Sequence, residues 1–261
     1  MSKLSEFVII TNGRSGSNYF VDVINQHPNA FNYGEILGEW SKKRILKKMP
    51  MCKTEEKYVG FWLENKAVYW LSQIFYYFKL RPNYKIKNRK NINAVGFKDF
   101  AINIDRLGLE SWLLRSEEIK VINLYRVNQL ERYISLCAMK KTGVVISNAI
   151  SKVDNKKILI DVEEMIESLS VFEEEKEYHK RIIEKIDKSR VFNICYEDFF
   201  EGDIDKSLMT KDMFKFIGVE PISVEGRHKK ILSKSLESRI SNFEEVKNRL
   251  IGGPFEKYLG L

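Results

Sequence analysis

The segment with the clearest chemical potential is Asn12–Asn18, NGRSGSN, which directly follows the strand-type run Phe7–Thr11. Its glycines, Gly13 and Gly16, permit positive φ and close approach of a ligand. Its serines can donate hydrogen bonds, and Arg14 can pair with two oxygens of a tetrahedral anion. Backbone N–H groups at the start of a helix also attract anions. The segment is therefore a candidate anion-binding loop, although an ordinary strand-to-helix connection fits these residues equally well.

Two common nucleotide-binding patterns do not fit this loop. The kinase P-loop GxxxxGK[ST] requires Lys and then Ser or Thr after its second glycine, whereas Ser17 and Asn18 follow Gly16. The pattern GxGxxG is absent as well. Three cysteines lack both CxxC and metal-ligand spacing: Cys52, Cys137 and Cys195. We therefore expect no metal and interpret the cysteines as reduced packing residues.

The elements that would position the loop are strand-to-helix units. A continuous apolar run of strand length occupies residues 7–11, and further strand candidates lie at 94–97, 120–125, where apolar residues dominate, and 191–196. Helical periodicity follows three of them, from Asn18 to His27, from an N-cap at Asn128 to a stop at Gly143, and over residues 208–217 before Gly218. Strands separated by helices predict an α/β fold with a central parallel sheet flanked by helices.

Longer helical patterns lie between and after these units. They cover Tyr58–Leu80, Ile158–Ile186 and a C-terminal helix with Leu236, Ile240, Phe243 and Leu250 on one face. We expect a single domain over residues 1–261 with an inserted helical region at about 40–90. The first pattern holds nine aromatic residues, too many for one helical face. They form either an aromatic core or an acceptor-binding wall.

The charge balance indicates an anionic partner without identifying it. Lys+Arg 44 exceed Asp+Glu 36, a net charge of +8, which suits nucleic acid, an anionic membrane surface or a polyanionic small ligand. Segments 41–53 and 79–90 each hold six basic residues and no acid, and solvated loops are the simpler interpretation of each. No apolar run approaches the ~20 residues of a membrane span, and the N-terminus lacks a signal-peptide pattern. We expect a cytoplasmic protein.

Two segments read together resemble a known family. FVIITNGRSGSNYFVDVINQHPNAFNYGEIL resembles the opening of sulfotransferases that use 3′-phosphoadenosine 5′-phosphosulfate (PAPS), in particular the bacterial and carbohydrate-type branch with an RSGS[TN] loop. VINLYRVNQLERYISLCAMKKTG resembles the second signature of that family, a strand ending in Arg and a helix containing Ser. Weaker likeness continues through GFKDF, CYEDFF and the C-terminal segment. The resemblance implies a P-loop-like sulfotransferase fold and no metal cofactor.

The resemblance also assigns donor-binding residues. The 5′-phosphosulfate of PAPS would be cradled by Arg14, Ser15, Gly16, Ser17 and Asn18. Arg126 and Ser135 would hold its 3′-phosphate. Basic residues near the end of the chain in relatives suggest a similar role for Lys230 and Lys234, and Lys98 in GFKDF could also reach a ligand oxygen or lie in water at its strand end.

Glu35, in the YGEIL segment, matches the position of the catalytic carboxylate in this branch. A base near the acceptor hydroxyl can accept its proton during attack on sulfur. Arg14 would stabilise charge on the leaving phosphate and so also act in catalysis. A surface or N-cap carboxylate is the simpler interpretation of Glu35. His27, before Pro28, fits a helix C-terminus, where imidazolium is favoured, better than it fits a base.

The predicted function is transfer of the sulfonate group from PAPS to a hydroxyl acceptor, a carbohydrate or a small molecule, with release of adenosine 3′,5′-bisphosphate. A kinase-like phosphotransferase is the enzymatic alternative, weakened by the missing Lys-Ser/Thr pair. A nucleic-acid-binding module is the non-enzymatic alternative, since two basic runs could track phosphates. The sequence leaves the acceptor and the oligomeric state open.

Overall fold

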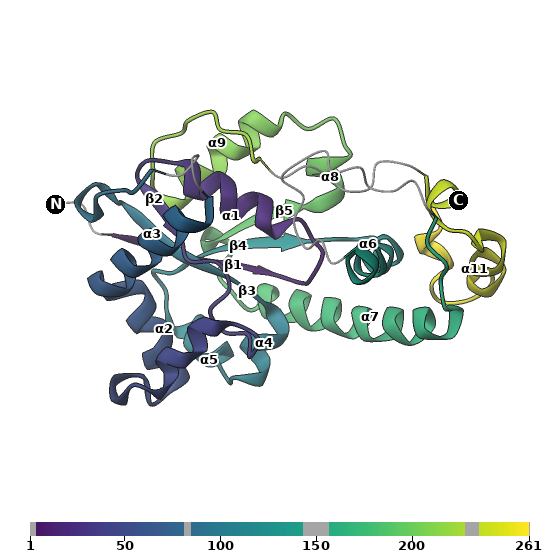
Figure 1. Cartoon of the computed structure of the whole chain (residues 1–261), viewed down its shortest axis with the longest axis horizontal. Helices are drawn as coiled ribbons and strands as arrows, with labels where there is room; N and C mark the ends of the chain where they lie inside the picture. Colours follow the sequence, from purple (N-terminus) through teal and green to yellow (C-terminus); the bar gives the residue numbers. More distant parts are fainter. Residues whose placement is uncertain (1–3, 81–84, 143–156, 228–234, 261) are drawn as a thin grey trace.

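A parallel sheet organises the chain (Figure 1). The computed structural model describes residues 4–80, 85–142, 157–227 and 235–260, and its sheet has five strands in the order β2-β3-β1-β4-β5. The strands are β1 (Ser5–Thr11), β2 (Ala30–Asn32), β3 (Ala94–Phe100), β4 (Lys120–Tyr125) and β5 (Val191–Cys195). All neighbouring strands pair in parallel. The α/β prediction is confirmed.

Alternate residues of β1 enter two different cores because successive side chains of a strand point to opposite faces. Val8 and Ile10 pack in the first core, and Phe7 and Ile9 in the second, all fully buried. Both faces of β1 are therefore covered, which explains its continuous apolar sequence.

Helices cover the two faces of the sheet (Figure 1). On one face lie α1 (Ser17–Gln26), α8 (Tyr196–Phe200) and α9 (Lys206–Ile217). On the other lie α2 (Glu55–Glu64), α3 (Lys66–Leu80), α4 (Ala101–Arg106), α5 (Glu110–Arg115) and the end of α7 (Val162–Glu184). Short 3₁₀ helices complete the described chain: η1 (Lys42–Lys48), η2 (Pro50–Cys52), η3 (Arg89–Asn91), η4 (Lys188–Arg190) and η5 (Glu256–Tyr258).

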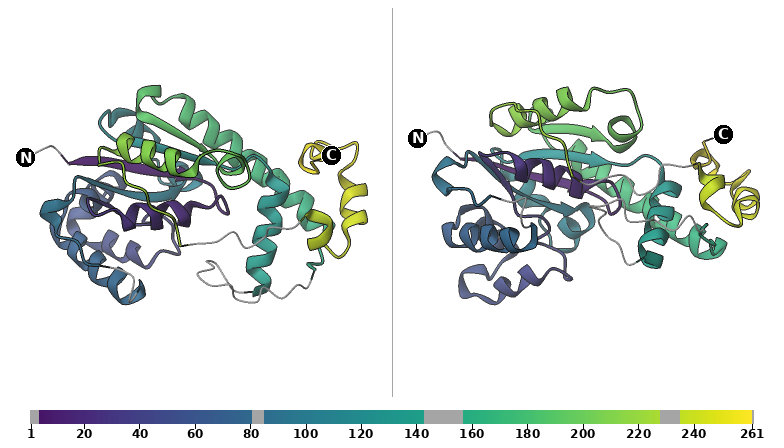
Figure 2. Two further views of the ribbon diagram at one scale, coloured as in Figure 1. Left: turned by 90° about the horizontal axis from the view of Figure 1, so that it is seen from above. Right: turned by 45° about the horizontal axis from the view of Figure 1, so that its top comes forward.

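A third core lies beyond the end of the sheet. It joins α6 (Gln129–Thr142) and the start of α7 to α10 (Leu236–Arg239), α11 (Phe243–Leu250) and η5. Both views in Figure 2 show these C-terminal helices beside α6 and α7 and away from the strands. The C-terminal segment is thus attached to the helix that carries the second signature.

Several local predictions are confirmed. The Asn128 side chain accepts a hydrogen bond from the Glu131 N–H at 2.9 Å, as expected of an N-cap. Gly218 ends α9 in the left-handed conformation, with φ 86°. The stop predicted at Gly143 lies outside the described residues.

Two predicted helices are wrong in their extent. The pattern at 58–80 is two helices, because Asn65 interrupts it and its side chain accepts a hydrogen bond from the Ala67 N–H at 2.8 Å. The C-terminal helix is also two, since Ile240 forms a parallel bridge with Ile158. Tyr196, assigned to a strand, begins α8. Strand β2 and helices α4, α5 and α8 were not predicted; each has only three to six residues, too few to show a period.

The strand register brings the carboxyl ends of the strands to one edge. Ile10 is paired with Asp99 of β3 and with Asn123 of β4, and Tyr125 with Cys195 of β5. The loops that follow these strands therefore meet at this edge, where ligands bind in open α/β sheets. Among the described helices, none combines the length and apolar character that crossing a membrane requires.

Candidate functional site

The loop after β1 has an unusual backbone. Arg14 has φ 63° and Gly16 has φ 76°, both in the left-handed region. That region is unfavourable for a residue with a Cβ, so Arg14 must be held there by its surroundings. At position 16 a Cβ would also lie 2.7 Å from the Phe200 ring. Gly16 is therefore required both by its φ and by the packing of α8.

Helix α1 starts at this loop, and no side chain of its own cap or first turn offsets the partial positive charge of its N-terminus. Its N-cap is Gly16, which offers no side chain, and its first turn contains no acidic residue. The first N–H groups of a helix lack partners within the helix and carry partial positive charge. Ser17 is buried and Asn18 half-buried in this first turn. The arrangement suits an anion.

The Ser15 hydroxyl is turned into the loop. It donates to the Asn12 carbonyl at 2.7 Å and pairs with the Thr11 hydroxyl, and Ser15 is almost completely buried. Its side chain thus maintains the loop in this structure, and its backbone N–H is the group left for a ligand.

The second signature meets the loop directly. The Arg14 Nε donates to the Ser135 Oγ of α6 at 3.1 Å, and Arg126, just after β4, donates from Nη1 to the Arg14 carbonyl at 3.2 Å. The residues that the sequence analysis assigns to the two ends of the donor are therefore brought together. That they bind it stays a prediction.

Arg126 is buried among protein groups. Its guanidinium lies 3.5 Å from the Glu131 carboxylate, 3.8 Å from that of Glu197 and 4.2 Å from the centre of the Tyr196 ring. Burial lowers the pKa of Arg14, and the neighbouring Arg126 charge lowers it further. Two guanidinium groups in such proximity repel each other, and an anion near both would relieve that repulsion.

Glu35 lies in the segment after β2, and its carboxylate is fixed. Lys98 of β3 forms an ion pair with one oxygen, and the Trp40 indole N–H donates to the other at 2.7 Å. Burial acts to raise the pKa of Glu35, but Lys98 and Trp40 outweigh it, so this pKa lies below its ordinary value. Glu35 is the N-cap of no described helix, and its side chain is 27% exposed, so it is a partly exposed carboxylate held by an ion pair.

The backbone around Glu35 is held by Asp99, which the sequence analysis missed. One carboxylate oxygen of the buried Asp99 accepts hydrogen bonds from the Ile36 and Leu37 N–H groups, at 2.9 and 2.7 Å. Lys98, the preceding residue, is only 2% exposed, so the expectation of a strand-end lysine in water is wrong. An apolar strand ending in Lys-Asp is the signal that could have drawn attention to both.

His27 occupies the C-cap of α1, at the other end of that helix from the loop. Its Nδ1 accepts from the Asn29 N–H at 3.0 Å and its Nε2 donates to the Glu220 carbonyl at 2.8 Å. Because Nδ1 accepts from an N–H group it carries no proton, and the ring is neutral in this structure. Burial acts in the same direction by lowering the pKa of His27. The helix-end position is confirmed, whereas a charged ring does not fit these two hydrogen bonds.

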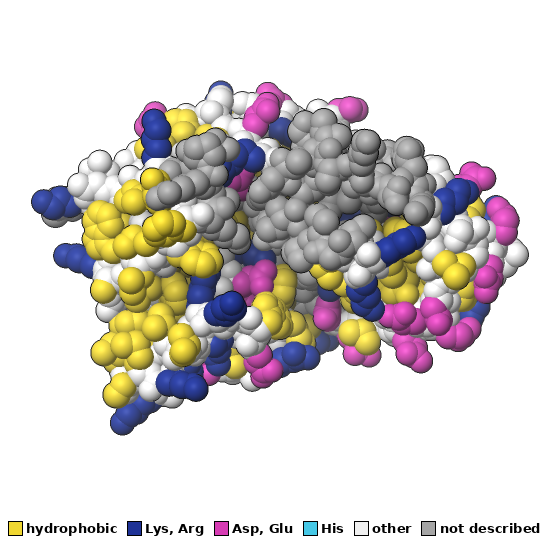
Figure 3. Space-filling view, viewed as in Figure 1, with side chains coloured by type: hydrophobic (Ala, Val, Ile, Leu, Met, Phe, Trp, Pro, Cys, Tyr) yellow, Lys and Arg dark blue, Asp and Glu magenta, His cyan; other side chains and the backbone are white. Residues whose placement is uncertain are grey.

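The basic and aromatic segments have mainly structural partners. Arg44 and Lys47 pair with Glu55, and Lys87 donates to two backbone carbonyls at 2.7 Å. The aromatic region divides: some rings lie in the core (Tyr58, Trp62, Tyr69) and others are exposed (Trp70, Phe75, Phe78). Figure 3 shows hydrophobic side chains gathered over α2 and α3, with basic ones around them. Lys230, Lys234 and His228 lie outside the described residues.

Among the described residues, no group of three His, Cys, Asp or Glu side chains could hold a metal ion.

The chain is similar to several known proteins, although no family model matches it. Nodulation protein H of Rhizobium tropici is 25% identical over 265 residues, which cover 98% of this chain and 93% of that protein. Nodulation protein H of Rhizobium meliloti is 20% identical, covering 98% and 95%.

Similar solved structures include a sulfotransferase from Alicyclobacillus acidocaldarius, with 13% identity, coverage of 100% of this chain and 97% of that one, and a TM-score of 0.42. The sulfotransferase domain of the Synechococcus PCC 7002 olefin synthase has 15% identity, coverage of 84% and 75%, and a TM-score of 0.39. The two curated relatives are thus aligned with this chain along almost its whole length and along almost the whole of their own.

Proposed function

We propose that this chain is a PAPS-dependent sulfotransferase, which transfers the sulfonate group to a hydroxyl of a carbohydrate or small molecule and releases adenosine 3′,5′-bisphosphate. The observation that carries the proposal is the 3.1 Å hydrogen bond from Arg14 to Ser135. It joins the loop and the second signature, which are far apart in the sequence and which the family resemblance assigns to one donor.

The residues at the carboxyl edge fit a ligand with several phosphate or sulfate oxygens. The loop and the start of α1 offer backbone N–H groups, and Arg14 and Arg126 add two guanidinium groups. When bound, PAPS supplies the sulfuryl group and a stable leaving phosphate. Arginines and N–H groups can neutralise such a ligand by themselves.

The residues on the β2 and β3 side fit the acceptor half of the reaction. As the acceptor oxygen bonds to sulfur and the bond from sulfur to the phosphate oxygen breaks, Glu35 would take the hydroxyl proton. Lys98 and Trp40 hold the pKa of Glu35 below its ordinary value, so the carboxylate is ionised at neutral pH and able to accept a proton. Arg14 would stabilise the charge that collects on the leaving phosphate.

Both alternatives explain fewer observations. A kinase-like phosphotransferase would lack the Lys-Ser/Thr pair of its loop. A nucleic-acid-binding module would use the basic runs, yet Arg44, Lys47 and Lys87 are bonded to other protein groups. Neither accounts for the convergence of Arg14, Arg126 and Ser135.

The test is a thermal shift series followed by a transfer assay. Adenosine 3′,5′-bisphosphate, ATP with Mg²⁺ and an oligonucleotide are added separately, and we expect only the first to raise the Tm, because a ligand stabilises the folded state that binds it. Labelled PAPS is then incubated with candidate hydroxyl acceptors to detect a sulfated product. Stabilisation by ATP with Mg²⁺ or by the oligonucleotide alone would contradict the proposal.

A further inference from the structure

Arg132 of α6 is a buried arginine beside the loop to which the sequence analysis gave no role. Its Nε donates to the Gly13 carbonyl at 2.8 Å, and its guanidinium forms an ion pair with Glu175 of α7. Its Nη1 donates to the Gln129 side chain at 3.3 Å, and its guanidinium carbon lies 3.7 Å from the centre of the Phe172 ring. Each nitrogen of this guanidinium therefore has a protein partner, and one of those partners is the loop.

Two consecutive loop carbonyls are bound by arginines. Arg132 binds the carbonyl of Gly13, and Arg126 binds that of Arg14. In a planar trans peptide the carbonyl and the following N–H point in opposite directions. The N–H groups of Arg14 and Ser15 are consequently directed away from the two arginines. An anion on that side of the loop can accept from the Ser15 N–H.

These bonds also account for the backbone of Arg14. Its φ of 63° is unfavourable for a residue with a Cβ, and its conformation sets the direction of both peptide groups that flank it. Because the flanking carbonyls are bound on both sides, the loop cannot relax to an ordinary conformation without losing two charge-assisted hydrogen bonds.

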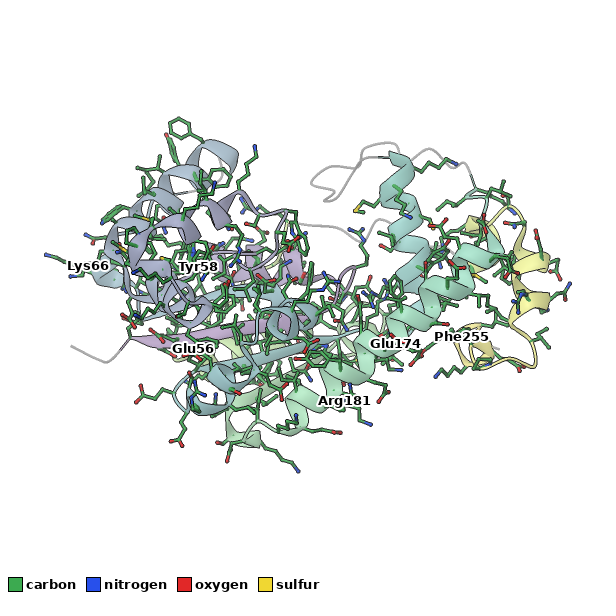
Figure 4. The ribbon with its side chains drawn as sticks, turned by 90° about the horizontal axis from the view of Figure 1, so that it is seen from below. Glu56, Tyr58, Lys66, Glu174, Arg181 and Phe255 are labelled. Carbon is green, nitrogen blue, oxygen red and sulfur yellow. The ribbon has the colours of Figure 1, made fainter. Side chains whose placement is uncertain are left out.

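The base of this arrangement is α7. Figure 4 shows α7 beside α6, between the sheet and the C-terminal helices. Glu175 holds the outer edge of the Arg132 guanidinium, and Phe172, one turn earlier, supports its flat face. Glu175 also neutralises the charge of Arg132. Arg132 therefore acts on the loop mainly by fixing the position of the Gly13 carbonyl, and adds little net positive charge to the site.

We propose that Arg132, held by Glu175, is a positioning residue that keeps the loop in its anion-binding conformation before the ligand arrives. The inference rests on the proposed function in one respect, that the anion is a phosphate or sulfate group of the donor. Arg132 acts through the Gly13 carbonyl and does not touch the donor.

The test measures binding of adenosine 3′,5′-bisphosphate and of inorganic pyrophosphate by calorimetry. Arg132→Ala is expected to weaken both ligands by about tenfold or more, the effect of losing one charge-assisted hydrogen bond. Guanidinium ion at millimolar concentration is expected to restore part of that affinity by occupying the vacated position, which a general loss of stability would not allow.

Arg190→Ala is the matched control. Arg190 also donates to backbone carbonyls, those of Leu113, Ser116 and Ile119, but at the amino edge of the sheet. This variant is expected to lower the Tm while keeping both affinities within about twofold of wild type, with no effect of guanidinium.

Glu175→Gln is the second variant, used if Arg132→Ala does not fold. It distinguishes an effect of the position of Arg132 on anion affinity from an effect of the net charge of the site. A site governed by net charge would bind anions more tightly once this acid is removed, whereas a looser Arg132 gives weaker binding, which we expect. Tighter binding in Glu175→Gln, or wild-type affinity in a folded Arg132→Ala, would overturn the inference. A wild-type chain that binds pyrophosphate but not the nucleotide would contradict the proposed function alone, and one that binds neither would overturn both.

Discussion

The two sides of the candidate site are both held by buried charged groups, but of opposite sign. Around Arg14, the guanidinium groups of Arg126 and Arg132 bind loop carbonyls. Around Glu35, the carboxylate of Asp99 binds the N–H groups of the next two residues. On the Arg14 side, cationic side chains bind the loop carbonyls, so N–H groups on the opposite face of the loop can bind an anion. On the Glu35 side, an anionic side chain binds the N–H groups that follow Glu35 and so fixes the backbone that carries this carboxylate. The sign of the buried group therefore differs with the task of each side.

The largest effect is expected from Glu35→Gln, which tests the Glu35 side alone. The amide keeps the size of the side chain but cannot take a proton, and loss of a positioned base typically costs ~100- to 10,000-fold in rate. We expect turnover at saturating PAPS to fall by at least about 100-fold, with affinity for the donor close to that of wild type.

Glu39→Gln is the control, since Glu39 is an exposed glutamate of the same segment. Its turnover is expected to match wild type. A Glu35→Gln rate within a few fold of wild type, with chemistry shown to limit single-turnover transfer, would remove Glu35 from the reaction. His27 offers no substitute, because its ring nitrogens are occupied at the other end of α1.

Arg126→Ala tests the donor side. We expect affinity for adenosine 3′,5′-bisphosphate to fall by about 1.5 to 3 kcal/mol, roughly 10- to 150-fold, because a charge-assisted hydrogen bond is lost. Ser135→Ala should act in the same direction but more weakly, since a neutral hydroxyl contributes less. Calorimetry on the folded variants gives both values.

Adenosine 5′-phosphosulfate, which lacks the 3′-phosphate, sharpens this test. If Arg126 holds the 3′-phosphate, this ligand loses much less affinity in Arg126→Ala than the bisphosphate does. Equal losses for the two ligands would show that Arg126 acts only through the Arg14 carbonyl, and the 3′-phosphate assignment would be wrong.

The local chemistry of the sequence was sufficient for part of this picture. The run 7–11 is buried on both faces and continuous in apolar residues, and residues 121–124 are buried and mostly apolar, which made these strands and the loop after β1 predictable. The meeting of Arg14, Arg126 and Ser135 followed from the resemblance of two segments to one family. None of these inferences needed a contact that the sequence does not display.

The features that could not be predicted from the sequence depend on contacts between residues far apart in the chain. Arg132 and Asp99 act on backbone groups 119 and 62 to 63 residues away, and no pattern near either residue marks those partners. The break in the C-terminal helix at Ile240 depends on its bridge to Ile158 in the same way. The neutral ring of His27 also has a distant partner, since its Nε2 donates to the carbonyl of Glu220, 193 residues away.

Asp99→Asn is expected to affect the Glu35 side and leave the donor side intact. All four hydrogen bonds that Asp99 accepts come from N–H groups, so an amide would turn its own NH₂ toward two of them. We expect a loss of about 1 to 3 kcal/mol in the free energy of unfolding, and turnover lowered by several fold as Glu35 shifts. Donor affinity should stay at the wild-type value, and a matching loss of affinity would show that the two sides are not independent.

The smallest effect at neutral pH, and the sharpest test of the Glu35 side, is expected from Lys98→Met. In the wild type the pKa of Glu35 lies below its ordinary value because the Lys98 ion pair and the Trp40 hydrogen bond outweigh burial. The carboxylate therefore stays ionised as the pH falls, and the rate declines only below the ordinary range of a glutamate. In Lys98→Met the burial remains and the opposing charge is gone, so the pKa of Glu35 rises and the acid limb of kcat/KM moves to higher pH. Lys120→Met, which removes a lysine from the amino end of β4, is the control and should leave that limb in place. An acid limb that is the same in Lys98→Met and wild type would mean that the titrating base is a group other than Glu35.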